Sequence, residues 1–128
     1  MQENKVVARF KNGAIKKGST GDFFPNRAIF HLKSGNGEIL EINVEELKAV
    51  CFVKSFEGDK GRMNKYTVPV PGGGREVSVK FPDGELIIGY TQGYSPTRSG
   101  FFLIPADLQN NNERIYVITS ATEKVTFL

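Results

Sequence analysis

Residues 6–13 read Val-Val-Ala-Arg-Phe-Lys-Asn-Gly, and residues 77–84 read Val-Ser-Val-Lys-Phe-Pro-Asp-Gly. The alignment of the two stretches continues without a gap to Leu32 and Leu103. A glycine, a proline and an arginine recur along it, at Gly18 and Gly89, Pro25 and Pro96, and Arg27 and Arg98. Self-similarity of this kind is typical of a repeated structural unit. We therefore predict two copies of one unit, at 1–57 and 76–128, joined by a linker at 58–75.

The local pattern within each copy is that of β-structure. Residues 6–10 and 77–81 alternate toward Asn-Gly and Asp-Gly pairs, which tolerate positive φ at both turn positions and predict tight hairpins. Gly18 and Gly89 interrupt the following strands, as glycines do where a small barrel bends. In the first copy we expect further strands at 28–33, 38–44 and 49–53, with one helical turn at 44–48. The predicted fold is all-β: two tandem five-stranded SH3-like or Sm-like small barrels related by internal duplication.

The spacing of residues 6–13, Gly18, Phe23 and residues 30–32 resembles the first sequence motif of the Sm-like family. That resemblance implies a small barrel that assembles into rings and binds RNA through an aspartate and an asparagine in one loop. Aligned on the glycines and Leu32, those two positions fall at Phe24 or Pro25 and at Ile29. Neither RNA-reading residue is present, so the resemblance implies the fold rather than the RNA site.

A second resemblance covers nearly the whole chain. Residues 22–27, 100–107 and 111–114 look like segments of an uncharacterised bacterial domain family. Members of that family occur alone or attached to signalling and repeat-containing proteins. The resemblance implies an accessory module of bacterial type and gives no residue a chemical role.

Composition narrows the function classes. The chain has 128 residues, of which 39% are hydrophobic, and no apolar run of the length that a membrane span needs. Its one cysteine, Cys51, and one histidine, His31, leave no thiolate metal site and few groups for acid–base or nucleophilic catalysis. We expect a cytoplasmic protein that is not an enzyme and needs no metal or cofactor.

One loop carries the same residue types in both copies. Phe23, Pro25 and Arg27 match Tyr94, Pro96 and Arg98. An arginine beside an aromatic residue can bind a carboxylate or another anion of a ligand or partner, because its guanidinium presents a rigid fork of donors. Alternatively, each arginine packs on its own aromatic residue and braces the loop.

Basic residues suggest a second candidate surface. The net charge is +3 and the isoelectric point is near 9.0. Lys11, Lys16 and Lys17 gather around the first predicted hairpin, where they could contact nucleic-acid phosphates.

Comparison of the two copies suggests a third candidate surface. Lys16 and Lys17 become Ile87 and Ile88 in the second copy. The same alignment exchanges polar residues for apolar ones at three further positions, which are Tyr90, Phe102 and Ile104. An apolar surface of this kind is usually shielded from water by another surface. We therefore expect these residues to pack between the barrels or between the subunits of a dimer.

These observations favour a non-enzymatic binding or adaptor module that engages another protein or itself. The alternative is an Sm-like protein that binds RNA or single-stranded DNA. Salt dependence separates the two, because phosphate binding weakens steeply with salt and an apolar interface does not.

Overall fold

The computed structural model describes residues 4–54, 74–106 and 112–128. The predicted linker at 58–75 lies almost entirely outside these residues, as does the stretch around residue 110. We call residues 4–54 the first half and residues 74–128 the second half. The prediction of an all-β chain is confirmed, since the described elements are strands with two short 3-10 turns. No helix in the described part of the chain is long and apolar enough to cross a membrane.

The first half contains five strands. They are β1 (Asn4–Phe10), β2 (Ile15–Thr20), β3 (Ile29–Lys33), β4 (Ile39–Asn43) and β5 (Leu47–Val53). The expected helical turn is a 3-10 turn, η1 (Val44–Glu46), which Asn43 caps by accepting a hydrogen bond from the Glu45 N–H. This turn reverses the chain between β4 and β5.

The second half repeats the order of elements. Its strands are β6 (Arg75–Lys80), β7 (Leu86–Thr91), β8 (Gly100–Pro105), β9 (Asn112–Ile118) and β10 (Lys124–Phe127), with η2 (Thr119–Ala121) between the last two. Strand registers recur as well: Val6 pairs with Phe52 across β1 and β5, and Val77 pairs with Phe127 across β6 and β10.

The hairpin turns differ from the sequence expectation in one detail. Gly13 and Gly84 have positive φ, at 91° and 92°, whereas no other residue type does in the described chain. The Gly13 N–H donates to the Phe10 carbonyl, and the Phe10 N–H donates to the Ala14 carbonyl. Each loop is therefore three residues long, with the glycine alone in the left-handed region. Asn12 accepts a hydrogen bond from the Ala14 N–H, which stabilises the turn without positive φ at the asparagine.

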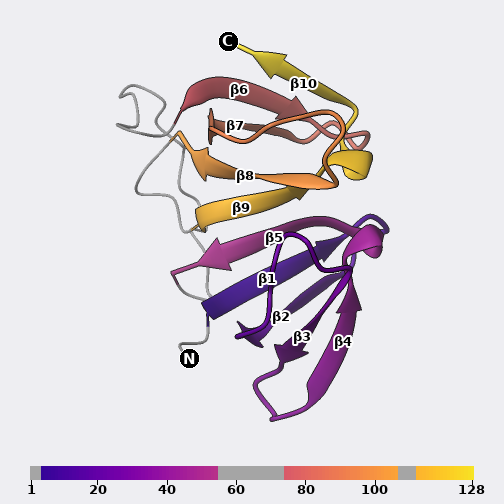
Figure 1. Cartoon of the computed structure of the whole chain (residues 1–128). Helices are drawn as coiled ribbons and strands as arrows, with labels where there is room; N and C mark the ends of the chain where they lie inside the picture. Colours follow the sequence, from indigo (N-terminus) through magenta and orange to yellow (C-terminus); the bar gives the residue numbers. More distant parts are fainter. Residues whose placement is uncertain (1–3, 55–73, 107–111) are drawn as a thin grey trace.

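Sheet topology corrects the expectation of two separate closed barrels. The strands form one open sheet in the order β10-β6-β7-β8-β9-β5-β1-β2-β3-β4. Strands β5 and β9 pair antiparallel and join the halves, and they lie side by side at the centre of Figure 1. The halves thus share backbone hydrogen bonds, in addition to any contact between sheet faces.

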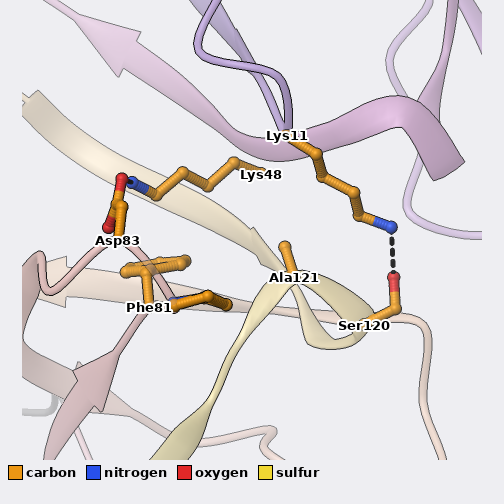
Figure 2. A pocket seen from close by; sticks show the side chains of 7 residues that line it. Lys11, Lys48, Phe81, Asp83, Ser120 and Ala121 are labelled. Atoms are coloured by element: carbon orange, nitrogen blue, oxygen red, sulfur yellow. Dashed lines mark hydrogen bonds and ion pairs between the residues drawn. The ribbon is translucent and has the colours of Figure 1, made fainter.

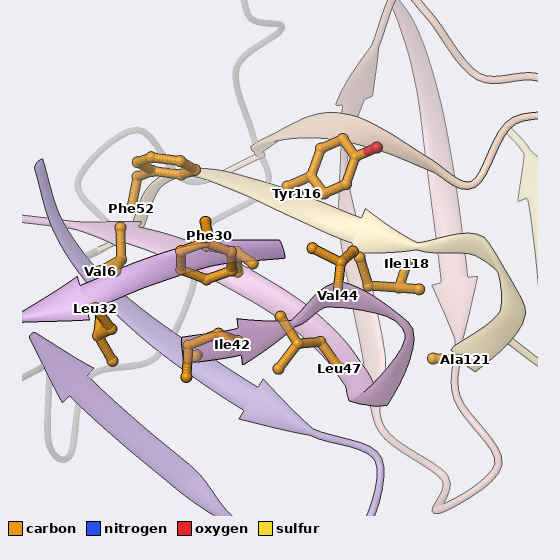
Figure 3. Packing of buried hydrophobic residues seen from close by; sticks show 12 residues of the cluster. Val6, Phe30, Leu32, Ile42, Val44, Leu47, Phe52, Tyr116, Ile118 and Ala121 are labelled. Carbon is orange, nitrogen blue, oxygen red and sulfur yellow. The ribbon is translucent and has the colours of Figure 1, made fainter. Parts of the chain in front are cut away.

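Two hydrophobic cores flank this junction, and both halves contribute to each. The first core packs β1, β3, β4 and β5 against Tyr116, Ile118 and Ala121 of the second half (Figure 3). The second core packs β6, β8 and β9 against Ala49, Cys51 and Val53 of β5. Every residue of β5 is consequently buried. Alternation along β5 and β9 sends successive side chains into opposite cores.

Candidate functional site

A groove of about 410 Å³ lies where the two halves meet, and we call it the junction groove. Its wall consists mainly of apolar side chains of the second half and a loop of the first. They are Tyr90, Phe101, Phe102, Ile104, Tyr116 and Pro25. Thr91, Gln92, Gly93, Gly100 and Arg98 complete the lining. An apolar cleft with few polar groups at its rim is the usual form of a binding site.

Three close contacts hold the groove in shape. The Tyr116 hydroxyl donates a hydrogen bond of 3.4 Å to the Pro25 carbonyl, which ties β9 to the first-half loop. A Cβ at Gly100 would lie 2.5 Å from the Tyr116 ring, so only glycine lets β8 begin this close to it. The Thr91 hydroxyl donates 2.7 Å to the Phe102 carbonyl and fixes β7 to β8.

Two polar side chains of the groove bear on its chemistry, and they are Arg98 and Tyr90. A Cβ at Gly93 would lie 3.8 Å from Arg98 Nη1, which places the exposed guanidinium beside Gly93. Tyr90 is half-buried and lies opposite Glu76 across β6 and β7. Partial desolvation and the neighbouring Glu76 carboxylate raise the pKa of Tyr90, so this hydroxyl stays protonated at neutral pH.

The matched loops place their residues differently. Arg27 stacks on Phe24, with its guanidinium 4.8 Å from the ring centroid, whereas Arg98 lines the junction groove. Phe23 packs edge-on against Phe30, Phe52, Phe102 and Tyr116. Tyr94 packs likewise against Phe101 and Phe127. Of these four candidates, Arg98 is the one that the structure brings into a groove.

The three lysines predicted to gather around the first hairpin have different surroundings. Lys11 donates a 2.8 Å hydrogen bond to Ser120, and the Lys16 ammonium lies 5.8 Å from the Phe10 ring centroid. Lys17 lies on the opposite face of β2 from Lys16, because side chains alternate along a strand. Register places Lys5 and Lys33 on either side of Ser19, on the face of Lys17. These exposed residues, Lys5, Lys17 and Lys33, form what we call the basic face.

At most of the equivalent positions the second half is apolar, although the counterpart of Lys5 is the acidic residue Glu76. Ile88, Tyr90 and Ile104 are the counterparts of Lys17, Ser19 and Lys33 in the two-copy alignment. Tyr90 pairs with Ile104 across β7 and β8, and all three side chains are half-buried. Tyr90 and Ile104 also line the junction groove, so an apolar surface runs from β7 and β8 into it.

The residues of the predicted apolar face therefore fall into two groups. Some pack against a core or against the first half, and the others stay partly exposed. Phe102 contacts rings of the first half, at 6.1 Å from Phe52 and 6.5 Å from Phe23 between centroids. Ile87 packs against the second core. The strand pairing of β5 with β9 joins the halves directly, and Phe102 of the predicted face adds a contact between them. Tyr90, Ile88 and Ile104 keep part of their surface exposed to solvent.

Four charged residues at the other end of the junction form a network that we call the charge cluster. Lys48 is 8% exposed, and its ammonium lies 2.7 Å from Asp83 and 2.5 Å from Glu85 (Figure 2 shows Lys48 and Asp83). Arg9 donates two hydrogen bonds to the Glu85 carboxylate, at 3.0 and 2.5 Å. Lys48 also lies 4.5 Å from the Phe81 ring centroid. Cations of the first half are thus neutralised by carboxylates of the second.

The charge cluster is satisfied internally, so its chemistry is that of a structural clamp. Burial raises the pKa of Glu85, but hydrogen bonds from Arg9 and Lys48 outweigh it and bring the pKa below its ordinary value. A hydrogen bond from Lys48 lowers the pKa of Asp83. Both carboxylates therefore stay charged at neutral pH, and each already has a cation bound.

The cysteine and the histidine each lie in a defined environment. Burial raises the pKa of the Cys51 thiol to about 11, which leaves it protonated within the second core. His31 contacts Asp22, with 2.6 Å between Nδ1 and Oδ2. No group of three histidine, cysteine or acidic side chains with the spacing of a metal site occurs among residues 4–54, 74–106 and 112–128.

Sequence reasoning placed Pro25 in a candidate loop, but it missed Tyr116, Lys5, Lys33 and the charge cluster. One signal for the cluster is present: Lys48 is a lysine in the apolar run Leu47–Val53, where an unpaired charge would be costly. Its partners come from a hairpin far along the chain, and no local pattern identifies them. The groove depends on the pairing of β5 with β9, which the repeat does not predict.

Comparison with known families places the chain. It matches a family of unknown function (DUF6982) over residues 2–128, and it belongs to that family. No curated protein and no solved structure matches it.

Proposed function

We propose that this chain, whose family has no known function, is a non-enzymatic protein-binding module. In this proposal the chain comprises two copies of one small five-stranded, barrel-like unit. The junction groove binds an extended segment of a partner protein. The observation that carries the proposal is the continuity of this groove with the half-exposed apolar surface of β7 and β8.

The chemistry of the groove defines the segment that fits. Aromatic walls at Tyr90, Phe102 and Tyr116 favour apolar side chains, and their area is buried at low entropic cost. The Arg98 guanidinium at the rim favours a carboxylate beside those side chains. The partner segment therefore contains two or three apolar residues and one aspartate or glutamate.

The described residues support a binding role over a catalytic one. The carboxylates of Asp83 and Glu85 and the ammonium of Lys48 are engaged in the charge cluster, and the thiol of Cys51 is buried and protonated. The junction groove itself contains no carboxylate, histidine or thiol among its lining residues. A groove of this composition supplies contacts and orientation rather than proton transfer.

We expect Arg98→Ala to weaken binding of a groove peptide about tenfold or more, because it removes a charge-assisted hydrogen bond. Peptides selected from a random display library on the wild-type protein supply the probe, and fluorescence anisotropy measures their affinity. Arg27→Ala is the matched control, since Arg27 is the equivalent arginine and stacks on Phe24 outside the groove.

A second pair of variants tests the apolar wall. Ile104→Lys should abolish binding of the same peptides, whereas Lys33→Ala at the equivalent position should leave it unchanged. Selected peptides that bind all four variants as well as the wild type would contradict the proposed site. So would a library that yields no peptide at all.

The basic face supports a second candidate function, binding of RNA or single-stranded DNA. Three lysines from three neighbouring strands lie on one exposed surface, where they could follow a phosphate backbone. Two of the loop aromatic residues that could stack on bases are instead packed, Phe23 in the first core and Tyr94 against the second. Phe24 is 42% exposed, but the Arg27 guanidinium lies over its ring. The observations therefore favour the protein-binding function.

If the basic face binds nucleic acid, anisotropy of a labelled random RNA or DNA strand rises at low salt and falls log-linearly as salt increases. Lys17→Ala and Lys33→Ala should then each reduce the affinity and the salt slope, while Lys16→Ala, on the other face of β2, should not. Under the protein-binding proposal we expect no anisotropy change at physiological salt.

A further inference from the structure

The strands at the two edges of the sheet could each pair with a further strand. Among the described residues, β4 and β10 each pair with one strand, while every other strand pairs with two. An edge strand presents unpaired N–H and C=O groups that can bind another strand.

Both edge strands have a counterpart at the central junction. Strand β10 lies beside β6 in the same register as β5 beside β1, with Val77 opposite Phe127 and Val6 opposite Phe52. Strand β4 lies beside β3 as β9 lies beside β8: Phe30 is opposite Ile42, and Phe101 is opposite Val117. The junction between the halves thus pairs the counterpart of β4 with the counterpart of β10.

Burial shows what β10 lacks. Val53 is 6% exposed at the end of β5, and its counterpart Leu128 is 65% exposed. Phe52 is 4% exposed, and its counterpart Phe127 is only half-buried. The difference follows from the neighbour strand, because β5 pairs with β9 and β10 has no strand on that side among the described residues.

We propose that β4 of one copy of this chain pairs antiparallel with β10 of a second copy, repeating the junction of β9 with β5. At that junction Tyr116 is opposite Val50 and Arg114 is opposite Phe52. The same register between copies brings Glu41 opposite Val125 and Ile39 opposite Phe127. The contact is head-to-tail, so each copy keeps one free edge and further copies add until a ring closes.

Backbone orientation agrees with this register. Along β4, the Ser34 N–H donates to Glu38 and the Val44 N–H donates to Ala28, at 2.9 Å each. Hydrogen-bonded pairs alternate in an antiparallel ladder, so Ile39 and Glu41 direct their N–H and C=O groups outward. On β10 the Leu128 N–H donates to Glu76, so Val125 and Phe127 direct theirs outward. The four outward residues are those that the register places opposite one another.

Side chains at the two edges are complementary. Ile39 is 59% exposed, and it meets Phe127 next to the exposed Leu128, which together remove apolar surface from water. Arg75 lies with its guanidinium 4.2 Å from the Phe127 ring centroid. Glu41 comes onto that face of the sheet, where its carboxylate can pair with Arg75.

Proline at an outward position blocks an edge without removing a hydrogen bond inside the sheet. Glu41→Pro blocks β4 and Val125→Pro blocks β10, with Glu41→Ala and Val125→Ala as matched controls. Ile39→Asp and Leu128→Asp form a second pair that places charge at exposed positions, which keeps the test valid if a proline variant does not fold. Sedimentation velocity over a concentration series measures the size of each.

We expect wild type and the Glu41→Ala control to form assemblies that grow with concentration, and each blocked variant to sediment as a single chain. An equimolar mixture of a β4-blocked and a β10-blocked variant should form a two-chain complex, because one open edge of each kind remains. A wild type that stays a single chain at all concentrations overturns the proposal. So does a variant with one blocked edge that still dimerises with itself, since that requires pairing of like edges.

Discussion

Replacing Glu85 with alanine is expected to lower the free energy of unfolding by about 2–3 kcal/mol, because it leaves buried cations without their carboxylate. Glu85 accepts hydrogen bonds from both Arg9 and Lys48, and the Lys48 side chain is 10% exposed. Asp83 remains for Lys48, but Arg9 loses the only ion pair that the described residues give it. Urea denaturation followed by circular dichroism measures the change.

An exposed ion pair of the second half supplies the control. Lys80 and Glu123 occupy the positions of Arg9 and Lys48, and their charged atoms are 3.7 Å apart with both side chains about half exposed. Glu123→Ala should therefore change the free energy of unfolding by no more than about 0.5 kcal/mol. Equal effects of Glu85→Ala and Glu123→Ala would show that the charge cluster does not clamp the halves.

The same cluster predicts a loss of stability in acid. The pKa values of Glu85 and Asp83 are lower in the folded chain than their ordinary values. Their contribution is therefore complete above the unfolded carboxyl pKa and is lost as the pH falls through the folded pKa values. Glu85→Ala should flatten this acid dependence, which urea titrations between neutral pH and pH 3 would detect (about the range of carboxyl titration).

Gly89→Ala is expected to destabilise the protein by about 3 kcal/mol or to prevent folding, because the new methyl group has no space. An added Cβ would overlap the backbone carbonyl oxygen of Ile104 and the side chain of Leu103. A backbone carbonyl in a paired strand cannot move aside as a flexible side chain can. Strands β7 and β8 would separate where Gly89 pairs with Pro105.

Gly18→Ala should behave in the same way, since its Cβ would overlap the Lys33 carbonyl oxygen and lie 2.9 Å from Leu32 Cγ. Gly35→Ala is the control, because nothing lies within 4 Å of its added Cβ, and it should change stability by less than about 0.5 kcal/mol. Soluble yield and urea midpoints compare the three variants. A Gly89→Ala protein as stable as the Gly35→Ala protein would contradict the close approach.

Local features of this protein could be predicted from its residues because they depend on near neighbours. Alternation of apolar and polar residues predicts the first hairpin strand, and Gly13 predicts the turn because it alone supplies positive φ there. Gly18 and Gly89 are required because the strands that follow approach them too closely for a side chain. The ladders that pair β1 with β2 and β6 with β7 run through these glycines without a register shift. The repeat predicts that both halves use the same strand order.

The amino-acid sequence by itself thus determined the strands and their turns. Only the tertiary structure decided that β5 and β9 pair, since backbone hydrogen bonds between edge strands carry little sequence information. That single pairing buries all of β5, brings Arg9 and Lys48 to Glu85, and sets Pro25 beside Tyr116 to form the junction groove. The site exists because residues distant in the chain become neighbours across this strand pair.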